Sequence, residues 1–261
     1  MPVSLNTAQH SNATLKLLKN YVILVRLLGI CKYLFTLIYM RVLELFSGTG
    51  SVGKVCKEYG WDVTSLDLKN ADINCDILQW DYTQYQPNHF DIIWASPPCN
   101  SFSKLQYTHR KKDEIIKNIE ATGLPILRRT EEIIDYLKPK YYFIENPQTG
   151  LMKKYLTRPR YDVDYCMYSD WGYKKCTSIW TNVKGFNPLL CNKKCGNMIE
   201  IKQDNKIHLI HRKHNGNSSR KAYYRADSGT TLQERYRIPP KLIKSLFDKV
   251  LLASVTISLR V

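Results

Sequence analysis

The sequence of 261 residues is poor in acidic side chains and contains no internal repeats. Its 23 Asp and Glu residues stand against 39 Lys and Arg residues, which gives a formal net charge of +16 and a pI near 9.4. This imbalance favours a polyanionic partner, with nucleic acid as the first expectation and a membrane surface as the weaker one. The length suits one core-forming domain with a small appended lobe, and we expect a monomer.

The sequence also lacks a long apolar segment free of charge. Its most apolar stretch, Tyr21–Tyr39, is interrupted by Arg26 and Lys32. A charge at the centre of a span costs roughly 2.5–3.5 kcal/mol, whereas each large apolar residue contributes only about 0.3–0.6 kcal/mol, so insertion is close to neutral. A membrane span is therefore not favoured, and Arg26 also breaks the hydrophobic region that a signal peptide needs. We treat residues 1–39 as an N-terminal extension, because Met40 stands immediately before the first convincing strand.

Cysteine is too sparse for a disulfide scaffold. Eight scattered cysteines fit an intracellular, reducing compartment, in which thiols stay free for catalysis or metal binding. Cys191 and Cys195 precede His208 and His211, and thiolates and imidazoles are the usual ligands of zinc. Their spacing matches no standard zinc finger. We therefore expect no metal, and zinc at these four residues is the alternative to side chains scattered on a basic surface.

A strand, a glycine loop, a helix and a second strand are predicted from Arg41 onward. The loop is Phe46-Ser-Gly-Thr-Gly50, and the second strand ends at Asp67. Two glycines let the backbone approach a ligand closely, and an acid about 20 residues further on is suited to hold ribose hydroxyls. Asp76 stands where a third strand would end and can accept from an adenine amino group, although an ordinary turn aspartate is the simpler interpretation.

The stretch Phe90–Ser103 predicts a buried strand that delivers a thiol to a loop. Two prolines stop the strand, so Cys99 follows its carboxyl end, where open α/β sheets bind their ligands. A thiol there can act as a nucleophile, and an inert buried cysteine is the alternative. The next apolar strand, Tyr141–Ile144, ends at Glu145, which places both side chains at one edge of the sheet. A glutamate there is costly unless it is bound or working, and a helix-capping acid is the alternative.

Beyond residue 150 the sequence becomes basic and irregular. Strands are predicted at Asp164–Tyr168 and Thr177–Trp180, joined by a turn that carries Lys174 and Lys175. Residues 184–234 combine many basic residues with few apolar runs, so we expect a small lobe whose loops suit a nucleic-acid groove. A solvated basic surface is the alternative. After this lobe, helical spacing of apolar residues predicts a final helix.

The order of these motifs resembles the DNA cytosine-5 methyltransferase family, and more closely its compact members in phages and large DNA viruses. Pro97-Pro-Cys99 resembles the nucleophile motif of that family, and Glu145-Asn-Pro147 resembles a variant of its Glu-Asn-Val triplet. The segment Glu234–Pro240 resembles an abbreviated form of the last two motifs. One departure is clear, because Tyr173-Lys-Lys-Cys-Thr177 stands where the family has Gln-x-Arg-x-Arg, so the arginine contacts have no counterpart.

The resemblance implies an α/β fold with a Rossmann-like, S-adenosylmethionine-dependent methyltransferase sheet and a small basic target-recognition lobe. The implied organisation is an extension (1–39), a catalytic core (40–183), the lobe (184–234) and a C-terminal helix that returns to the core (235–261). The implied cofactor-binding residues are Phe46, Ser47, Gly48, Thr49, Gly50, Asp67, Asp76, Ile77 and Pro97. The implied nucleic-acid-binding residues are Ser103, Asn146, Lys174, Lys175 and Thr177.

The implied reaction is methylation of C5 of cytosine in DNA. The Cys99 thiolate would add to C6 while Glu145 stabilises protonated N3, and the methyl group would come from S-adenosylmethionine. Three alternatives remain: methylation of a base amino group, which the cysteine after Pro97-Pro98 disfavours; an RNA (tRNA) cytosine-5 methyltransferase; and a catalytically silent DNA-binding member of the fold. Retention of both catalytic candidates argues against the silent form.

Overall fold

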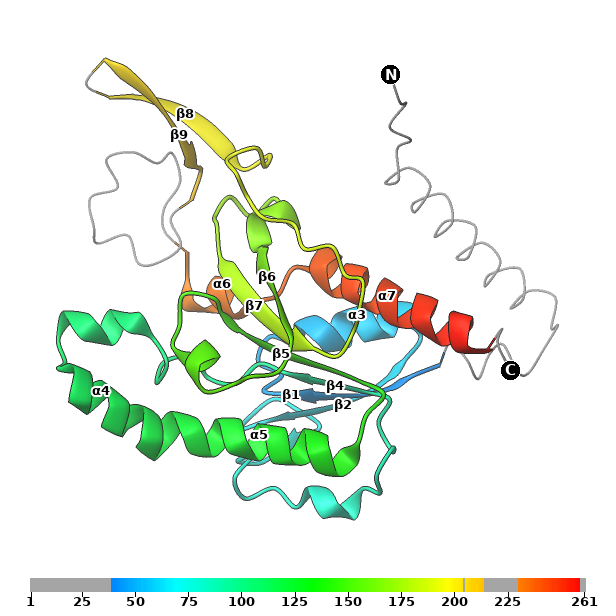
Figure 1. Ribbon diagram of the computed structural model, residues 1–261. Coiled ribbons are helices and arrows are strands. Elements are labelled where there is room, and N and C mark those ends of the chain that lie inside the picture. The colour runs from blue at the N-terminus through cyan, green and yellow to red at the C-terminus, as the bar shows by residue number, and fades with distance from the viewer. Residues whose placement is uncertain (1–38, 204, 214–229, 259–261) are drawn as a thin grey trace, which may run out of the picture. The chain divides into compact units, whose positions relative to one another are not determined.

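A seven-stranded sheet organises the part of the chain that the structure describes (Figure 1). The computed structural model describes residues 39–203, 205–213 and 230–258, so the expected N-terminal extension lies outside the described residues apart from Tyr39. The strands of this sheet are β1 (Arg41–Leu45), β2 (Asp62–Asp67), β3 (Ile73–Asn74), β4 (Ile92–Ala95), β5 (Tyr141–Pro147), β6 (Arg160–Asp164) and β7 (Cys176–Thr181). Their order is β3-β2-β1-β4-β5-β7-β6, and β7 alone runs antiparallel to its neighbours. The expected α/β class with a mostly parallel sheet is confirmed.

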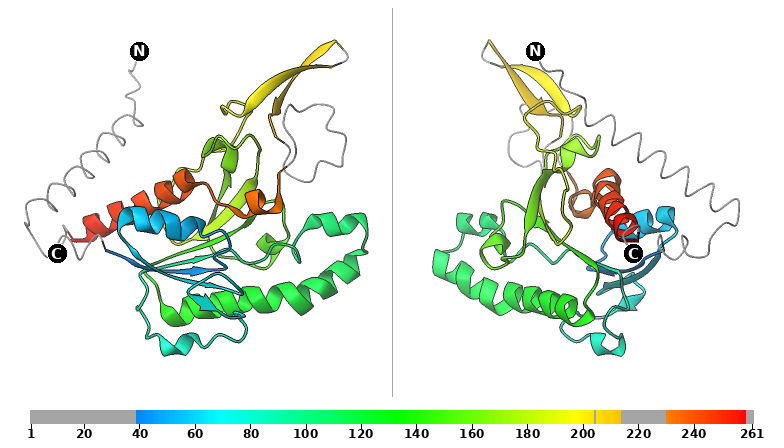
Figure 2. Two further views of the ribbon diagram at one scale, coloured as in Figure 1. Left: turned by 180° about the vertical axis from the view of Figure 1, so that it is seen from behind. Right: turned by 45° about the vertical axis from the view of Figure 1, so that its right-hand side comes forward.

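Helices cover both faces of the sheet (Figure 1, Figure 2). The α-helices are α3 (Ser51–Tyr59), α4 (Lys112–Asn118), α5 (Leu124–Leu137), α6 (Leu232–Tyr236) and α7 (Pro240–Ser258). Helices α3 and α7 lie over one face, and α5 lies over the other. Residues 40–249 form one compact unit. None of the helices in the described part of the chain has the length and hydropathy that a bilayer crossing requires.

Alternation along the buried strands explains how one sheet receives helices on both sides. In β4, Trp94 stacks on Phe143 of β5 with ring centroids 5.0 Å apart and meets Phe247 of α7 edge-on. Its neighbour Ile93 belongs instead to the apolar cluster that contains Leu127 of α5. Successive side chains of a strand point to opposite faces, so a continuous apolar run supplies both cores.

The basic lobe contains a two-stranded hairpin where the sequence analysis expected loops. Strands β8 (Met198–Gln203) and β9 (Lys206–His211) pair antiparallel and share no ladder with the large sheet. The Asn197 side chain anchors the base of the hairpin, because its Nδ2 donates to Cys166 O at 2.8 Å and its Oδ1 accepts from Gly172 N at 2.8 Å. Much of β9 is exposed, with Ile207 70% exposed.

The predicted strand Asp164–Tyr168 is wrong. Strand β6 ends at Asp164, and Tyr165–Met167 forms a 3₁₀ turn instead. At the end of β6, the Asp164 carboxylate accepts a hydrogen bond from Cys191 N at 2.7 Å. The apolar side chains that suggested a strand are buried by tertiary packing, because Tyr165 is fully buried and Cys166 is 3% exposed.

Candidate active site

The loop between β1 and α3 turns tightly at the carboxyl edge of the sheet. Gly48 and Gly50 have positive φ angles of 49° and 63°, which a residue with a side chain rarely adopts. The Gly48 N–H donates to Asp67 Oδ2 at 2.8 Å, so the glycine loop and the acid at the end of β2 lie together, as the sequence analysis expected. A Cβ atom on Gly50 would meet nothing within 4 Å, so space beside the loop is open. This arrangement fits a ribose-bearing cofactor.

Glu44 of β1 holds the start of α3, directly after this loop, and the sequence analysis did not identify Glu44. Its carboxylate accepts from Val52 N at 3.1 Å and Gly53 N at 2.9 Å, the free donors at the start of α3. Burial raises the pKa of Glu44 to about 7, although the two backbone donors act in the opposite direction. The signal that could have found it is a glutamate inside the apolar strand Arg41–Leu45.

The remaining cofactor candidates lie in two different settings. The Asp76 carboxylate accepts from Leu78 N at 2.9 Å, which is the turn geometry of the simpler interpretation, and the side chain is exposed. Ile77 is 3% exposed and belongs to the apolar core. Phe46 packs against the same core, Ser47 is buried, and the Thr49 hydroxyl lies 2.8 Å from that of Ser51. Their cofactor contacts stay predictions.

Cys99 lies in the loop after β4, and a buried hydrogen bond ties this loop to β5. The Asn146 Nδ2 donates to Pro97 O at 2.9 Å. Among the residues that the structure describes, Asn146 Oδ1 has no hydrogen-bond partner although it is buried, so an acceptor stands ready beside the loop. Burial raises the pKa of the Cys99 thiol, Glu145 raises it further, and Lys175 acts in the opposite direction. The hydrogen bond between Asn146 and Pro97 thus holds the loop of Cys99 against the strand that carries Glu145.

Glu145 receives two donors on one carboxylate oxygen. The Tyr165 hydroxyl donates to Oε1 at 2.9 Å, and the Lys175 ammonium group lies 3.3 Å from the same atom. Glu145 is 6% exposed, so little water screens these contacts. Burial raises the pKa of Tyr165 well above its usual value, and the charge of Glu145 adds to this effect, so Tyr165 remains a donor. Sequence reasoning missed Tyr165, for which no local pattern gives a signal.

The candidate nucleic-acid-binding residues separate in the structure. The ammonium group of Lys174 points to Asp164, at 3.1 Å from Oδ2, whereas that of Lys175 points to Glu145. Thr177 is fully buried in β7, and the Ser103 hydroxyl accepts from Leu105 N as the cap of the 3₁₀ turn Lys104–Thr108. These positions leave the DNA contacts of all these residues as predictions.

Comparisons with known proteins identify relatives of this chain. The family model described as C-5 cytosine-specific DNA methylase matches residues 40–181. A protein of Frog virus 3 (isolate Goorha) named "Probable DNA (cytosine-5)-methyltransferase" is 45% identical over 219 residues, which cover 80% of this chain and 99% of the viral protein.

Solved structures give weaker likenesses. The Entamoeba histolytica methyltransferase EhMeth has a TM-score of 0.43 at 17% identity, covering 61% of this chain and 58% of that one. The S. pombe Dnmt2 methyltransferase has a TM-score of 0.34 at 16% identity, covering 56% and 51% of the two chains.

Proposed function

The chain belongs to the C-5 cytosine-specific DNA methylase family and is a DNA (cytosine-5)-methyltransferase, and we propose that it methylates cytosine through a covalent adduct on Cys99. S-adenosylmethionine is the proposed methyl donor. The observation that carries this proposal is the convergence of two strand ends. Asn146 donates to Pro97 O, and the charge of Glu145 acts on the Cys99 thiol. A nucleophile and an acid that meet at the carboxyl edge of a sheet suit a covalent addition.

The glycine loop and Asp67 are the groups that would hold the cofactor. Asp67 accepts one backbone N–H on each carboxylate oxygen, from Gly48 at 2.8 Å and Leu68 at 2.7 Å. Each oxygen keeps a further lone pair for a ribose hydroxyl. When bound, S-adenosylmethionine supplies an electrophilic methyl group on a sulfonium.

Cys99 and Glu145 share the activation of the base. The Sγ atom of Cys99 forms a bond to C6 of cytosine, and N3 gains the proton of the Glu145 carboxyl. The electron pair of the C5–C6 bond then becomes available at C5, which would take the methyl group as the bond from methyl to the sulfonium breaks. Water acting as a base takes the C5 proton, which restores the double bond as the bond between C6 and Sγ breaks and the thiolate leaves. N3 returns its proton to the Glu145 carboxylate.

The resting site stores the required proton on sulfur. The raised pKa of Cys99 keeps it a thiol near neutral pH, and the Lys175 ammonium group lies 3.3 Å from Glu145 Oε1. Moving one proton from Cys99 to Glu145 gives the reactive thiolate and carboxylic acid. Tyr165 holds Oε1 during this exchange, which leaves Oε2 to face the base. Tyr165 is therefore a positioning residue.

We propose that the basic lobe binds the same DNA that the active site methylates. The target atom lies inside the duplex, so the cytosine must be flipped out, and cations must hold the distorted strand. The described cations in and beside the hairpin are Lys184, Lys193, Lys194, Lys202, Lys206, Arg212 and Lys213. Few side chains of so small a lobe can reach base edges, so we expect a short or degenerate target sequence.

Methyl transfer from labelled S-adenosylmethionine tests this function directly. The full chain is incubated with separate DNA and RNA pools, and the nucleosides are separated after digestion. We expect label in 5-methylcytosine from DNA and none when Cys99→Ser replaces the wild type. Label only in RNA would assign the substrate differently, and label on a base amino group would contradict the covalent mechanism.

A further inference from the structure

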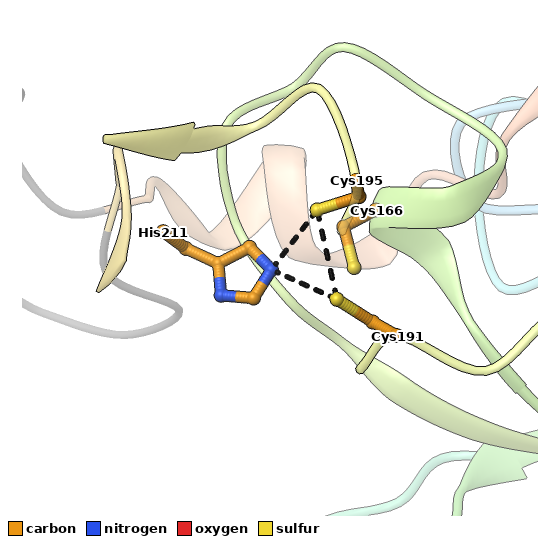
Figure 3. A group of neighbouring side chains, drawn as sticks. All are labelled: Cys166, Cys191, Cys195 and His211. Atoms are coloured by element: carbon orange, nitrogen blue, oxygen red, sulfur yellow. Dashed lines mark hydrogen bonds between the residues drawn. The ribbon is translucent and has the colours of Figure 1, made fainter. Parts of the chain in front are cut away.

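Four sulfur and nitrogen atoms converge beside the base of the β8–β9 hairpin (Figure 3). They belong to Cys166, Cys191, Cys195 and His211, and all lie within 4.8 Å of one another. Cys191 Sγ is 3.6 Å from Cys195 Sγ, and His211 Nε2 is 3.5 Å and 3.4 Å from these two sulfurs. The sequence analysis offered His208 where the structure has Cys166. His208 is exposed and lies outside the group.

The three separations among Cys191, Cys195 and His211 are close to the edges of a tetrahedron around zinc. With Zn–S bonds of about 2.3 Å and a Zn–N bond of about 2.0–2.1 Å, tetrahedral angles place sulfurs about 3.8 Å apart and sulfur and nitrogen about 3.5–3.6 Å apart. A disulfide between Cys191 and Cys195 would instead need about 2.05 Å between the sulfurs. Three thiols and an imidazole form a soft ligand set, which selects zinc over magnesium or calcium.

Hydrogen bonds around the group hold its backbone in place. Cys191 N donates to Asp164 Oδ2 at 2.7 Å, and Asn197 Nδ2 donates to Cys166 O at 2.8 Å. Cys166 and Cys195 are 3% and 8% exposed, so water has little access to two of the four ligands. Ordered surroundings of this kind orient the ligands of metal sites.

We propose that Cys166, Cys191, Cys195 and His211 bind one structural Zn²⁺ ion. Four protein ligands complete its tetrahedral shell, so no position remains for a catalytic water. Cys166 comes from the turn after β6, Cys191 and Cys195 from the loop before β8, and His211 from the end of β9. The ion therefore fastens both ends of the hairpin to the large sheet.

The zinc ion also lies close to the support of the catalytic acid. Cys166 directly follows Tyr165, whose hydroxyl donates to Glu145. Asp164, on the other side of Tyr165, pairs with Lys174 and accepts from Cys191 N. Three consecutive residues thus connect the zinc ligands, the hairpin and Glu145. Zinc here would fix the lobe and the acid in one frame.

Metal analysis of the full chain tests this site without any activity measurement. The protein is purified under reducing conditions without chelator, and bound metals are measured by mass spectrometry. We expect about one zinc per chain, as for a closed four-ligand site. Cys191→Ser and Cys195→Ser should lower this content to a small fraction. The matched control His208→Ala should keep it, because that imidazole lies outside the group.

A second measurement covers variants that fail to fold. Wild-type protein stripped of metal and loaded with Co²⁺ should show the absorption of a tetrahedral cobalt–thiolate site, and added Zn²⁺ should remove it. Chelation should also speed proteolysis between Met198 and His211 while the segment Arg41–Asp67 stays protected. The proposal is overturned if the wild-type protein binds no metal after reconstitution. It is also overturned if two of the three ligand cysteines form a disulfide, detected as a mass loss of two hydrogens, while the zinc content stays unchanged. Because neither readout involves methyl transfer, failure here leaves the proposed reaction standing.

Discussion

The loop after β4 and the base of the β8–β9 hairpin both present cysteine, but the groups around the sulfur atoms differ. The charge of Glu145 acts on the Cys99 thiol, Lys175 pairs with Glu145, and Cys99 does not belong to the four-residue group. Cys191 faces a second thiol and an imidazole within 3.6 Å. A carboxyl neighbour gives a thiol a proton acceptor, whereas soft neighbours give it a shared metal. The neighbours, supplied by distant parts of the chain, decide the chemistry of each sulfur.

Cys99→Ser should give the largest effect, because it should abolish the chemistry of the first region without changing the metal site of the second. A hydroxyl is far less nucleophilic than a thiolate near neutral pH, so methyl transfer should fall by on the order of 10³-fold or more. Zinc content, cofactor affinity and DNA affinity should stay close to those of the wild type. Rates are measured with labelled cofactor, and affinities by calorimetry and gel shift. Substantial residual 5-methylcytosine would remove Cys99 from the reaction.

Glu145→Gln tests whether the partner of Cys99 is an acid. The amide keeps the size of the side chain but supplies no carboxyl proton, so turnover should fall by on the order of 10²-fold. Covalent trapping of a DNA containing 5-fluorocytosine should slow similarly, since it needs the same attack. Cofactor binding should not change. Wild-type trapping rates in this variant would show that Glu145 is structural.

The same variant should change the pH profile. In the wild type, the resting thiol and carboxylate carry as many protons as the reactive thiolate and carboxylic acid, so the trapping rate should be nearly flat around neutral pH. In Glu145→Gln only the thiolate is needed. The substitution removes the charge of Glu145, but burial, the largest cause of the raised pKa of Cys99, remains and keeps the loss of its proton above this range. The rate should then rise about tenfold per pH unit. A flat profile in the variant would contradict this proton exchange.

Asp67→Ala should separate cofactor binding from both cysteine regions. Hydrogen bonds to a charged group contribute roughly 1.5–3 kcal/mol, so loss of the ribose contact should weaken S-adenosylmethionine binding about 13- to 160-fold. DNA affinity and zinc content should not move. Calorimetry with the cofactor alone gives the result, and unchanged affinity would remove Asp67 from the site.

Tyr165→Phe should have the smallest effect, because Tyr165 positions another residue. The variant loses one hydrogen bond to Glu145, worth roughly 0.5–1.5 kcal/mol, so kcat should fall about 2- to 13-fold. A positioning role predicts this change in kcat with KM for DNA unchanged. Combined with Glu145→Gln, the substitution should add little, since both act on one carboxyl. Full additivity would show that Tyr165 acts elsewhere.

Local patterns were enough for the first half of the chain. The glycine loop and Cys99 follow strands whose apolar runs are visible in the sequence. Asp67 is the last residue of β2 and Glu145 lies near the end of β5, and parallel strands deliver such residues to one edge. The group around Cys191 was only half visible. Cys166 lies 25 residues before it, inside a stretch that resembled a strand. The hairpin was also not predicted. Ile199, Ile201, Ile207 and Leu209 alternate with polar residues as in a strand, but they stand in a basic stretch without long apolar runs.

Long-range contacts account for the other omissions. Lys174 and Lys175 are adjacent in sequence, yet β7 begins just after them, and their ammonium groups reach different acids. Tyr165 meets Glu145 across 20 positions. Neither contact has a periodic signature. The insertion of β7 between β5 and β6 brings Lys175 to Glu145 and Lys174 to Asp164.

The position of β4 and β5 in the sheet predicts the order in which parts of the protein unfold on heating. Both strands have neighbours on each side within the seven-stranded sheet, whereas β8 and β9 pair only with each other. Amides in such interior strands exchange through global unfolding, and those of a small exposed hairpin exchange through local opening. Because we propose that the lobe holds DNA, we expect a warmed sample to release DNA while Cys99 and Glu145 keep their positions. On cooling from that intermediate temperature, the rate of DNA methylation should recover as fast as the hairpin re-forms, because the large sheet has stayed folded.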